Sequence, residues 1–274
     1  MPHGFAAPRT RATLSDVRWL LMAVLFVLSA ACATPPDPPA AAASPAGPTR
    51  VEVLGTVPHD PEAFTQGLEL VDGVLYEGTG LEGQSSLRRV NPRTGEVERR
   101  VDLPDSLFGE GITVVGDRIW QITWRNGVAM ERDRTTLEEV RRVTYEGEGW
   151  GLCHDGDRLV MSDGSDRLTF RDPESFAETG TVAVRRGGQP VTRLNELECV
   201  GGQVWANVWQ TDKVVRIDPT NGKVTDTVDL SGVRPADVPK SDVLNGIAAV
   251  PGTDEFLVTG KNWPTMFRVR FTGG

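Results

Sequence analysis

LFGEGITVVGDRIWQITWRNGVAMERDRTTLEEVRRVTYE, residues 107–146, is the stretch of this chain that decides its fold. It begins with a strand-like segment, FGEGITVV, and a turn at Gly116 leads into a second segment, RIWQITW. A third strand runs into the turn within MERDRTTLEEV, and a fourth strand follows that turn. Short runs of β-branched and aromatic residues bounded by turn residues are typical of antiparallel strands. The stretch therefore predicts one four-stranded sheet.

This unit is repeated five times from residue 50 onward. Its first strands are FTQGLELV, FGEGITVV, EGWGLCHD, LNELECVG and LNGIAAVP. The turn after each first strand begins near a glycine, namely Gly73, Gly116, Gly156, Gly201 and Gly252. Four strands in a period of about 40 to 50 residues are typical of a propeller blade. We therefore predict an all-β, five-bladed β-propeller. A β-sandwich also has short strands and regular turns, but its strands do not repeat in groups of four.

The two ends of the repeat region complement each other. The last copy ends at MFRVRF without a fourth strand, and a spare strand, Val51 to Val57, precedes the first copy. An N-terminal strand that completes the last blade would close the ring and remove two exposed sheet edges. We expect that arrangement.

The N-terminal region has the pattern of a secretory leader. An apolar run from Trp19 to Ala31 follows three arginines and ends in small residues before Cys32, which predicts a signal peptide over residues 1–31. Leu28-Ser29-Ala30-Ala31-Cys32 resembles a bacterial lipobox, although the leucine lies four residues before the cysteine instead of three. Either Cys32 is lipidated and the protein is anchored outside the cytoplasm, or the leader is cut nearby and the protein is secreted. Residues 32–49 form an Ala/Pro-rich linker, and residues 50–274 form the propeller domain.

Composition excludes several classes of function. The net charge of −9 argues against a nucleic-acid partner. Three cysteines cannot build a zinc site of four ligands, and with His59 and His154 as its two histidines the propeller region is a poor source of a histidine-rich metal centre. Cys153 and Cys199 lie in first strands of neighbouring copies, so either a disulfide or two buried thiols fits the sequence.

Chemically distinctive side chains occupy matching positions of the copies. Six residues before the turn glycine stand Glu110, Trp150 and Asn195, with Gln66 and Asn245 near the same place in copies one and five. In the second strands, the equivalent position holds Trp124, Trp209 and Lys261. Blades are related by rotation about a central channel, so equivalent positions should converge at one mouth of that channel.

Such a mouth is an aromatic pocket with few polar groups, which is the usual form of a small-molecule or peptide-terminus site. A carboxylate among tryptophans is desolvated, which raises its pKa and suits it to proton transfer near neutral pH. We therefore predict that Glu110 is a general acid and base.

At these residues the chain closely resembles the glutamine cyclotransferases of the plant latex type, which also occur in bacteria. The resemblance covers about Val51 to Phe271, and its most specific segments are AFTQGLEL, LFGEG, QITW, GEGWGL, LNELE and TGKNWP. It implies catalytic residues Glu110, Asn195 and Lys261. It also implies a substrate-binding set of Phe64, Gln66, Phe108, Trp124, Trp150 and Trp209.

The resemblance further implies the chemistry. The α-amine of an N-terminal glutamine on a peptide or protein attacks its own γ-carboxamide, which gives pyroglutamate and ammonia without a required cofactor. Glu110 would transfer protons, Asn195 and Lys261 would stabilise the oxyanion, and the tryptophans would fold the substrate. Some members hold calcium, so a structural calcium ion is compatible with the resemblance. We expect a monomer whose contact with a membrane is limited to the lipid anchor.

Two rival functions fit a propeller. One is a non-catalytic binding platform outside the cytoplasm, and the other is a metal-dependent lactonase with inward carboxylate and amide ligands. A binding platform has no need of Glu110 or Lys261. A lactonase needs several carboxylates, whereas this mouth carries a single clear one.

Overall fold

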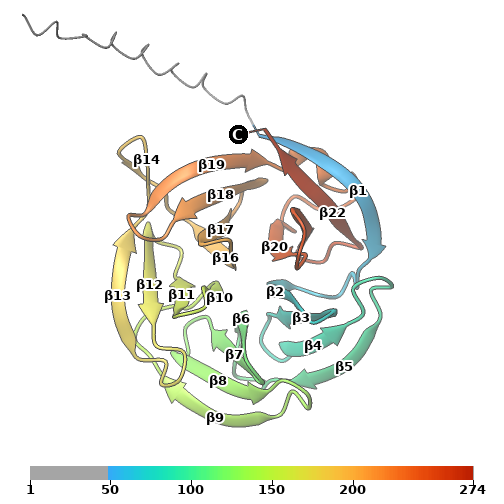
Figure 1. The fold of residues 1–274 in the computed structure, drawn as a ribbon. Coiled ribbons are helices and arrows are strands. Elements are labelled where there is room, and N and C mark those ends of the chain that lie inside the picture. Colours follow the sequence, from blue (N-terminus) through green and yellow to red (C-terminus); the bar gives the residue numbers. More distant parts are fainter. Residues whose placement is uncertain (1–48, 274) are drawn as a thin grey trace, which may run out of the picture. The chain divides into compact units, whose positions relative to one another are not determined.

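The computed structural model describes residues 49–273 of the chain. Within this range five sheets lie around a common axis, and the innermost strand of each sheet faces that axis (Figure 1). Apart from one short 3-10 helix, η1 (Ser231–Val233), the regular structure is β-strand. The predicted all-β, five-bladed propeller is thus confirmed.

Each blade is an antiparallel meander that runs from the axis outward. The first blade contains β2 (Thr65–Val71), β3 (Val74–Thr79), β4 (Ser86–Val90) and β5 (Val97–Asp102). The second contains β6 (Gly109–Val115), β7 (Arg118–Thr123), β8 (Val128–Asp133) and β9 (Glu139–Thr144). The third contains β10 (Leu152–His154), β11 (Leu159–Ser162), β12 (Arg167–Arg171) and β13 (Glu178–Ala183). The fourth contains β16 (Leu194–Val200), β17 (Gln203–Val208), β18 (Lys213–Asp218) and β19 (Lys223–Asp229).

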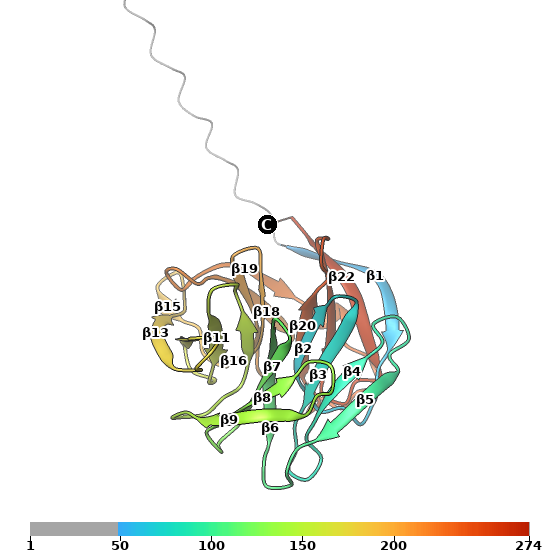
Figure 2. The same cartoon turned by 60° about the horizontal axis from the view of Figure 1, so that its bottom comes forward.

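The fifth blade contains both ends of the described chain. Its strands are β20 (Leu244–Ala249), β21 (Glu255–Gly260), β22 (Thr265–Thr272) and, as the outer strand, β1 (Arg50–Pro58). The β1 and β22 strands pair antiparallel from Arg50 opposite Thr272 to Pro58 opposite Thr265. Figure 2 shows the two strands side by side from a second direction. The first and last strands of the described residues therefore share one ladder of hydrogen bonds.

A small hairpin was not anticipated from the sequence. It consists of β14 (Arg185–Arg186) and β15 (Gln189–Pro190), and Arg185 pairs with Lys223 at the edge of β19. Gly187 and Gly188 form its two-residue turn and both have positive φ angles, which is the backbone that such a tight hairpin needs. The hairpin widens the fourth sheet beyond the four strands that the repeat predicts.

The inner strands lie very close to one another around the axis. The Gly111 backbone N–H, on β6, donates to the Trp150 carbonyl of the next blade at 2.9 Å. A Cβ atom at Gly111 would lie 2.6 Å from the Leu152 nitrogen, and one at Gly151 would lie 2.1 Å from the Asn195 oxygen. Neither contact is sterically allowed, so glycine is required where neighbouring inner strands meet.

Hydrophobic side chains fill the spaces between blades. One cluster joins Trp120 and Ile122 of the second blade to Leu152 and Phe176 of the third. The third and fourth blades are also joined covalently, because Cys153 and Cys199 form a disulfide with a Cα–Cα distance of 5.4 Å. Of the two arrangements that the sequence allowed for these cysteines, the structure contains the bonded one.

The predicted leader, the lipidation site at Cys32 and nearly all of the linker lie outside the described residues. Between residues 49 and 273, no helix is long and apolar enough to span a membrane.

The close approach of the inner strands can be tested with alanine. We expect Gly151→Ala to lower the free energy of unfolding by about 3 kcal/mol, since the added methyl group meets a backbone oxygen that cannot move alone. Gly232→Ala is the matched control, because a Cβ atom there meets nothing within 4 Å. Guanidinium unfolding measures both variants, and equal midpoints would contradict the proposed constraint.

Candidate active site

One pocket collects all nine residues that the sequence analysis assigned to the site, whereas Asn245, which was aligned with them in copy five, does not line it. Its volume is about 400 Å³, within the usual range for a site that encloses a small ligand. The predicted residues that line it are Phe64, Gln66, Phe108, Glu110, Trp124, Trp150, Asn195, Trp209 and Lys261. Three further lining residues were not predicted, and they are Arg125, Ser241 and Val243. The pocket is therefore built by segments from all five blades.

The polar residues enter the pocket at bulges of the inner strands. In β6, the pairing with β7 shifts by one residue between Gly109 and Ile112, which is where Glu110 stands. The same shift occurs between Leu194 and Leu197, on either side of Asn195. An extra residue in one strand bends it and re-aims a side chain. Repetition of this bulge from blade to blade points the distinctive side chains at the same mouth.

Two of the tryptophans and the lysine lie one residue beyond the strands in which they were predicted. Trp124, Trp209 and Lys261 directly follow β7, β17 and β21. Each donates its backbone N–H to the residue just before its blade's inner strand, at 3.0, 2.8 and 3.0 Å. The acceptors are the carbonyl oxygens of Phe108, Arg193 and Val243. Because this single bond replaces regular pairing, the side chains turn toward the mouth.

Glu110 is the one carboxylate of the pocket lining, and it is buried. Its Oε1 accepts a hydrogen bond from Gln66 Nε2 at 2.8 Å, and Gln66 Oε1 in turn accepts one from Asn245 Nδ2 at 3.0 Å. Glu110 Oε2 has no protein partner. Burial raises the pKa of Glu110 well above its ordinary value, while the Lys261 cation opposes the rise and the Glu148 carboxylate adds to it. A buried acceptor without a partner is costly unless a ligand donates to it.

Lys261 supplies positive charge to the same pocket. Its Nζ lies 4.5 Å from the centre of the Phe64 ring. Burial lowers the pKa of Lys261, and the negative charge of Glu110 opposes that change. A desolvated cation acts strongly on charge that develops nearby, because little water screens it.

The aromatic side chains form two walls. Phe108 packs edge to face on Phe64 and on Trp124, with ring centres 6.0 and 5.5 Å away, and Trp150 packs edge to face on Trp209 at 5.4 Å. Contacts of this kind restrict the rings to fixed orientations. The pocket is thus a slot of defined shape before any ligand enters.

Glu148 positions both walls and was missed by the sequence analysis. Its Oε2 accepts hydrogen bonds from Trp124 Nε1 at 2.9 Å and from Trp150 Nε1 at 3.0 Å. Its Oε1 accepts from Arg125, whose guanidinium lies 3.9 Å from the centre of the Trp124 ring. Its place in GEGWGL, two residues before Trp150, was the signal available in the sequence. That signal is weak, because an acidic residue in a turn is usually just solvated.

The described residues offer no metal centre. Between residues 49 and 273, no group of three or more His, Cys, Asp or Glu side chains is placed to hold a metal ion. In the channel, Glu196 accepts backbone N–H groups from Leu68 at 3.2 Å and Ile247 at 2.8 Å. Burial raises its pKa to about 8, against the effect of those two hydrogen bonds. These two hydrogen bonds occupy both carboxyl oxygens of Glu196.

The arrangement suits a ligand that carries both nitrogen donors and a carbonyl group. An amine or amide N–H could donate to the free oxygen of Glu110, or to Asn195 Oδ1, which also lacks a partner. Lys261 could face the carbonyl oxygen of the same ligand. The pocket can therefore combine proton transfer with stabilisation of negative charge on oxygen.

Comparison with known proteins shows a consistent relationship. The sequence model of the family described as glutamine cyclotransferase matches residues 23–271. A glutaminyl-peptide cyclotransferase of Arabidopsis thaliana is 40% identical over 226 residues, which cover 80% of this chain and 71% of that protein. The crystal structure of Myxococcus xanthus glutaminyl cyclase superposes with a TM-score of 0.77 at 37% identity. That match covers 83% of this chain and all of the other.

The electrostatic coupling within the pocket can be measured without a substrate. We expect Lys261→Met to raise the pKa of Glu110 further, because the cation that opposes the effect of burial is removed. Infrared titration of the carboxyl C=O band, with a Glu110→Gln protein as the spectral blank, reports that pKa. Lys223→Met, on the exposed outer strand β19, is the control and should leave it unchanged. A Glu110 pKa that stays constant or falls in Lys261→Met would contradict the coupling.

Proposed function

The chain belongs to the glutamine cyclotransferase family, and we propose that its pocket carries out the family's reaction through Glu110, Asn195 and Lys261. As an acyltransferase it converts the N-terminal glutamine of a peptide or protein to pyroglutamate, with release of ammonia. The observation that carries our assignment is the buried Glu110 carboxylate, which lines the same pocket as Lys261 and has one oxygen without a partner.

Glu110 moves the protons. It takes one proton from the substrate's α-ammonium group, and the freed amine nitrogen then attacks the γ-carbonyl carbon to form the ring C–N bond. The protonated Glu110 donates to the amide nitrogen as the old C–N bond breaks and ammonia leaves. The attacking nitrogen then gives its second proton to the Glu110 carboxylate, and the departing ammonia takes that proton as ammonium, which restores the carboxylate. A raised pKa supports this double role, because the carboxyl group must both accept and donate near neutral pH.

Lys261 and Asn195 stabilise the tetrahedral intermediate. Negative charge develops on the γ-carbonyl oxygen as the amine attacks. Two basic side chains line the pocket, Arg125 and Lys261, and Arg125 is already paired with Glu148. The Lys261 ammonium group therefore stabilises that charge. Asn195 contributes its amide, which is held on the β16 bulge. Both groups are buried, so their effect on the developing charge is stronger than it would be in water.

The slot provides the geometry for ring closure. The amine and the γ-carbonyl belong to one flexible side chain, and they react only when that chain is folded back on itself. Walls formed by Trp124, Trp150 and Trp209 favour the folded form, and Gln66 helps to hold the substrate terminus. Restriction to a near-attack geometry can account for several kcal/mol of the barrier.

The reaction as written requires no cofactor, because Glu110 transfers the protons and Lys261 and Asn195 stabilise the negative charge that develops. Calcium takes no part in any step.

We also propose that the protein works outside the cytoplasm, tethered by a lipid on Cys32. The Cys153–Cys199 disulfide supports an oxidising compartment, and the leader pattern supports export. We propose a monomer. In residues 49–273 the exposed large hydrophobic side chains are scattered over β1, β9 and β16, and they are Val53, Leu54, Val140 and Val200.

The catalytic assignment is tested by replacing one atom. Glu110→Gln keeps the shape of the side chain but cannot transfer protons, so ammonia release from a Gln-initiated dipeptide should fall at least about a hundredfold. Glu98→Gln, the same exchange on the exposed strand β5, should keep full activity. Excess EDTA should leave the rate of the wild type unchanged.

Two results would count against this assignment. A folded Glu110→Gln protein with normal turnover would remove Glu110 from the mechanism. A folded wild type that releases no ammonia would favour the alternative, a non-catalytic binding propeller.

Lipid attachment is tested by cell fractionation. The wild type should enter the detergent phase of a Triton X-114 extract, whereas Cys32→Ser should remain in the aqueous phase because it has no thiol to acylate. Ser29→Ala preserves the cysteine and serves as the control. If the wild type is found in the aqueous phase, the protein is secreted without an anchor.

A further inference from the structure

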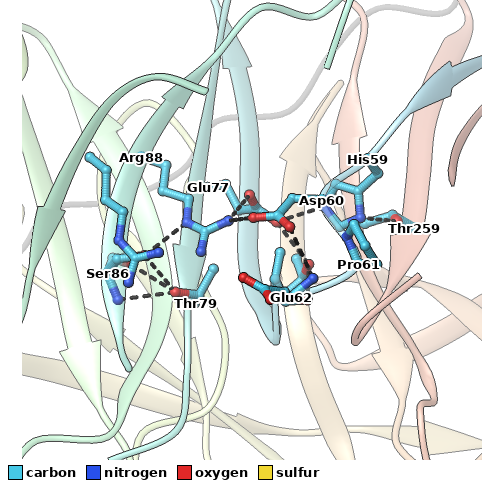
Figure 3. Close-up of polar contacts among 12 residues, drawn as sticks. His59, Asp60, Pro61, Glu62, Glu77, Thr79, Ser86, Arg88 and Thr259 are labelled. Atoms are coloured by element: carbon cyan, nitrogen blue, oxygen red, sulfur yellow. Dashed lines mark hydrogen bonds and ion pairs between the residues drawn. The ribbon is translucent and has the colours of Figure 1, made fainter. Parts of the chain in front are cut away.

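A buried ion pair lies behind the pocket, at the junction of the first and fifth blades. His59 Nε2 is 2.8 Å from Glu77 Oε1, and both side chains are almost fully buried. Figure 3 shows them within a polar network that continues to Asp60 and Arg88. Arg88 Nη1 lies 2.8 Å from Asp60 Oδ2 and 3.8 Å from Glu77 Oε2. None of these four residues lines the pocket, and the mechanism above uses none of them.

The contacts of His59 fit a ring with a proton on each nitrogen. Nδ1 lies 2.6 Å from the Trp263 carbonyl oxygen, which can only accept, and Nε2 faces the Glu77 carboxylate. Glu77 Oε1 also accepts from Thr65 Oγ1 at 2.8 Å. With His59 as an imidazolium ion, two cations face two anions in the network. With neutral His59 the network would carry an uncompensated negative charge inside the protein.

Charge in the surroundings agrees with this protonation state. Burial by itself lowers the pKa of His59, but the Glu77 carboxylate, the hydrogen bond to Trp263 and the Asp60 carboxylate together raise it above the ordinary value of 6.5. The pKa of Glu77 is lowered, because His59 and Arg88 outweigh the effect of burial. From the fifth blade, two uncharged groups face the ring, namely the Trp263 carbonyl and Thr259 Oγ1, which is 3.4 Å from Nδ1.

One arm of the network reaches Lys261. The turn after β21 carries Lys261, Asn262 and Trp263, and Asn262 is held at a positive φ of 56°. His59 fixes that turn through the Trp263 carbonyl and, with its own backbone N–H, through Pro264 at 2.9 Å. The turn that carries Lys261 is therefore held by two hydrogen bonds from His59.

The other arm reaches Gln66. Glu77 accepts from Thr65, and the next residue, Gln66, donates to Glu110 at 2.8 Å. The segment from His59 to Gln66 also contacts the lysine turn directly, since Asn262 N–H donates to the Ala63 carbonyl at 2.8 Å. A single ion pair thus bears on two polar groups of the pocket that belong to different blades.

We propose that His59 and Glu77 are a positioning pair for the cyclisation reaction, which holds Lys261 and Gln66 in place while His59 is an imidazolium ion and releases them when it loses its proton. This inference rests on the proposed function of the pocket.

The sign of the pH dependence follows from the direction of the pKa shift. A histidine with a raised pKa stabilises the fold fully below its unfolded pKa of about 6.5, and that contribution is lost as the pH rises through the higher folded pKa. Above that pH one nitrogen of the His59 ring has no proton to donate, although it still faces an acceptor oxygen. Activity should therefore decline on the alkaline side as His59 loses its proton.

The test compares pH profiles of kcat/KM for the wild type and Glu77→Gln. Removal of the carboxylate lowers the pKa of His59, so the alkaline decline should move down by about one pH unit or more. Glu131→Gln is the control, because Glu131 is an equally buried carboxylate that pairs with Arg118 and Arg141, away from the pocket. Glu131→Gln should lower the melting temperature but leave the alkaline decline of kcat/KM at the same pH as in the wild type.

Titration of the histidine ring by NMR, without substrate, separates this inference from the proposed function. The chain has three histidines, and His59→Gln and His154→Gln proteins assign their signals. We expect a His59 pKa above 6.5 that falls in Glu77→Gln. A pKa at or below 6.5 overturns the ion pair even if no ammonia is ever released. An active enzyme whose alkaline decline does not follow the pKa of His59 overturns its positioning role.

Discussion

The close approach of five inner strands around one axis is the constraint on which the rest of this molecule depends. At Gly111 and Gly151 the neighbouring strand leaves no space for a Cβ atom, and Gly111 uses that proximity to donate a backbone hydrogen bond to the next blade. Four of the five inner strands, all except β10, accommodate the crowding with a bulge. Because the bulges recur at equivalent places, they point Gln66, Glu110 and Asn195 at one mouth, and the site is a consequence of how the ring packs.

Burial at that mouth then creates the electrostatics. The same desolvation shifts the pKa of Glu110 upward and that of Lys261 downward, while each group opposes the shift of the other. Neither residue is in a direct ion pair, so the pair stays available to a substrate. In the network behind the pocket the charges are matched instead, with His59 and Arg88 against Glu77 and Asp60. Charged groups without a direct ion-pair partner therefore line the pocket, whereas paired charged groups lie at the junction of the first and fifth blades.

Much of the site could be predicted because the fold repeats. The alignment of five copies placed Glu110, Trp150 and Asn195 at one position, and the structure brings them into one pocket. Phe64 and Phe108 came from the family resemblance alone. What the sequence did not reveal depends on contacts between blades. The role of Glu148 arises from two indole N–H groups in different blades that meet one carboxylate oxygen. Nothing in the sequence indicated that His59 lies beside Glu77 and Trp263.

The sequence by itself determined the number of blades, the positions of the turns and the residues that converge, because these depend on local periodicity and on rotational equivalence. Only the tertiary structure decided which of these groups have partners. It bonded Cys153 to Cys199, left Glu110 Oε2 without a partner and enclosed His59 between two acceptors. The physical reason is that hydrogen bonding and desolvation change when the distances between segments far apart in the chain differ by a few tenths of an ångström, and a one-dimensional pattern does not contain those distances.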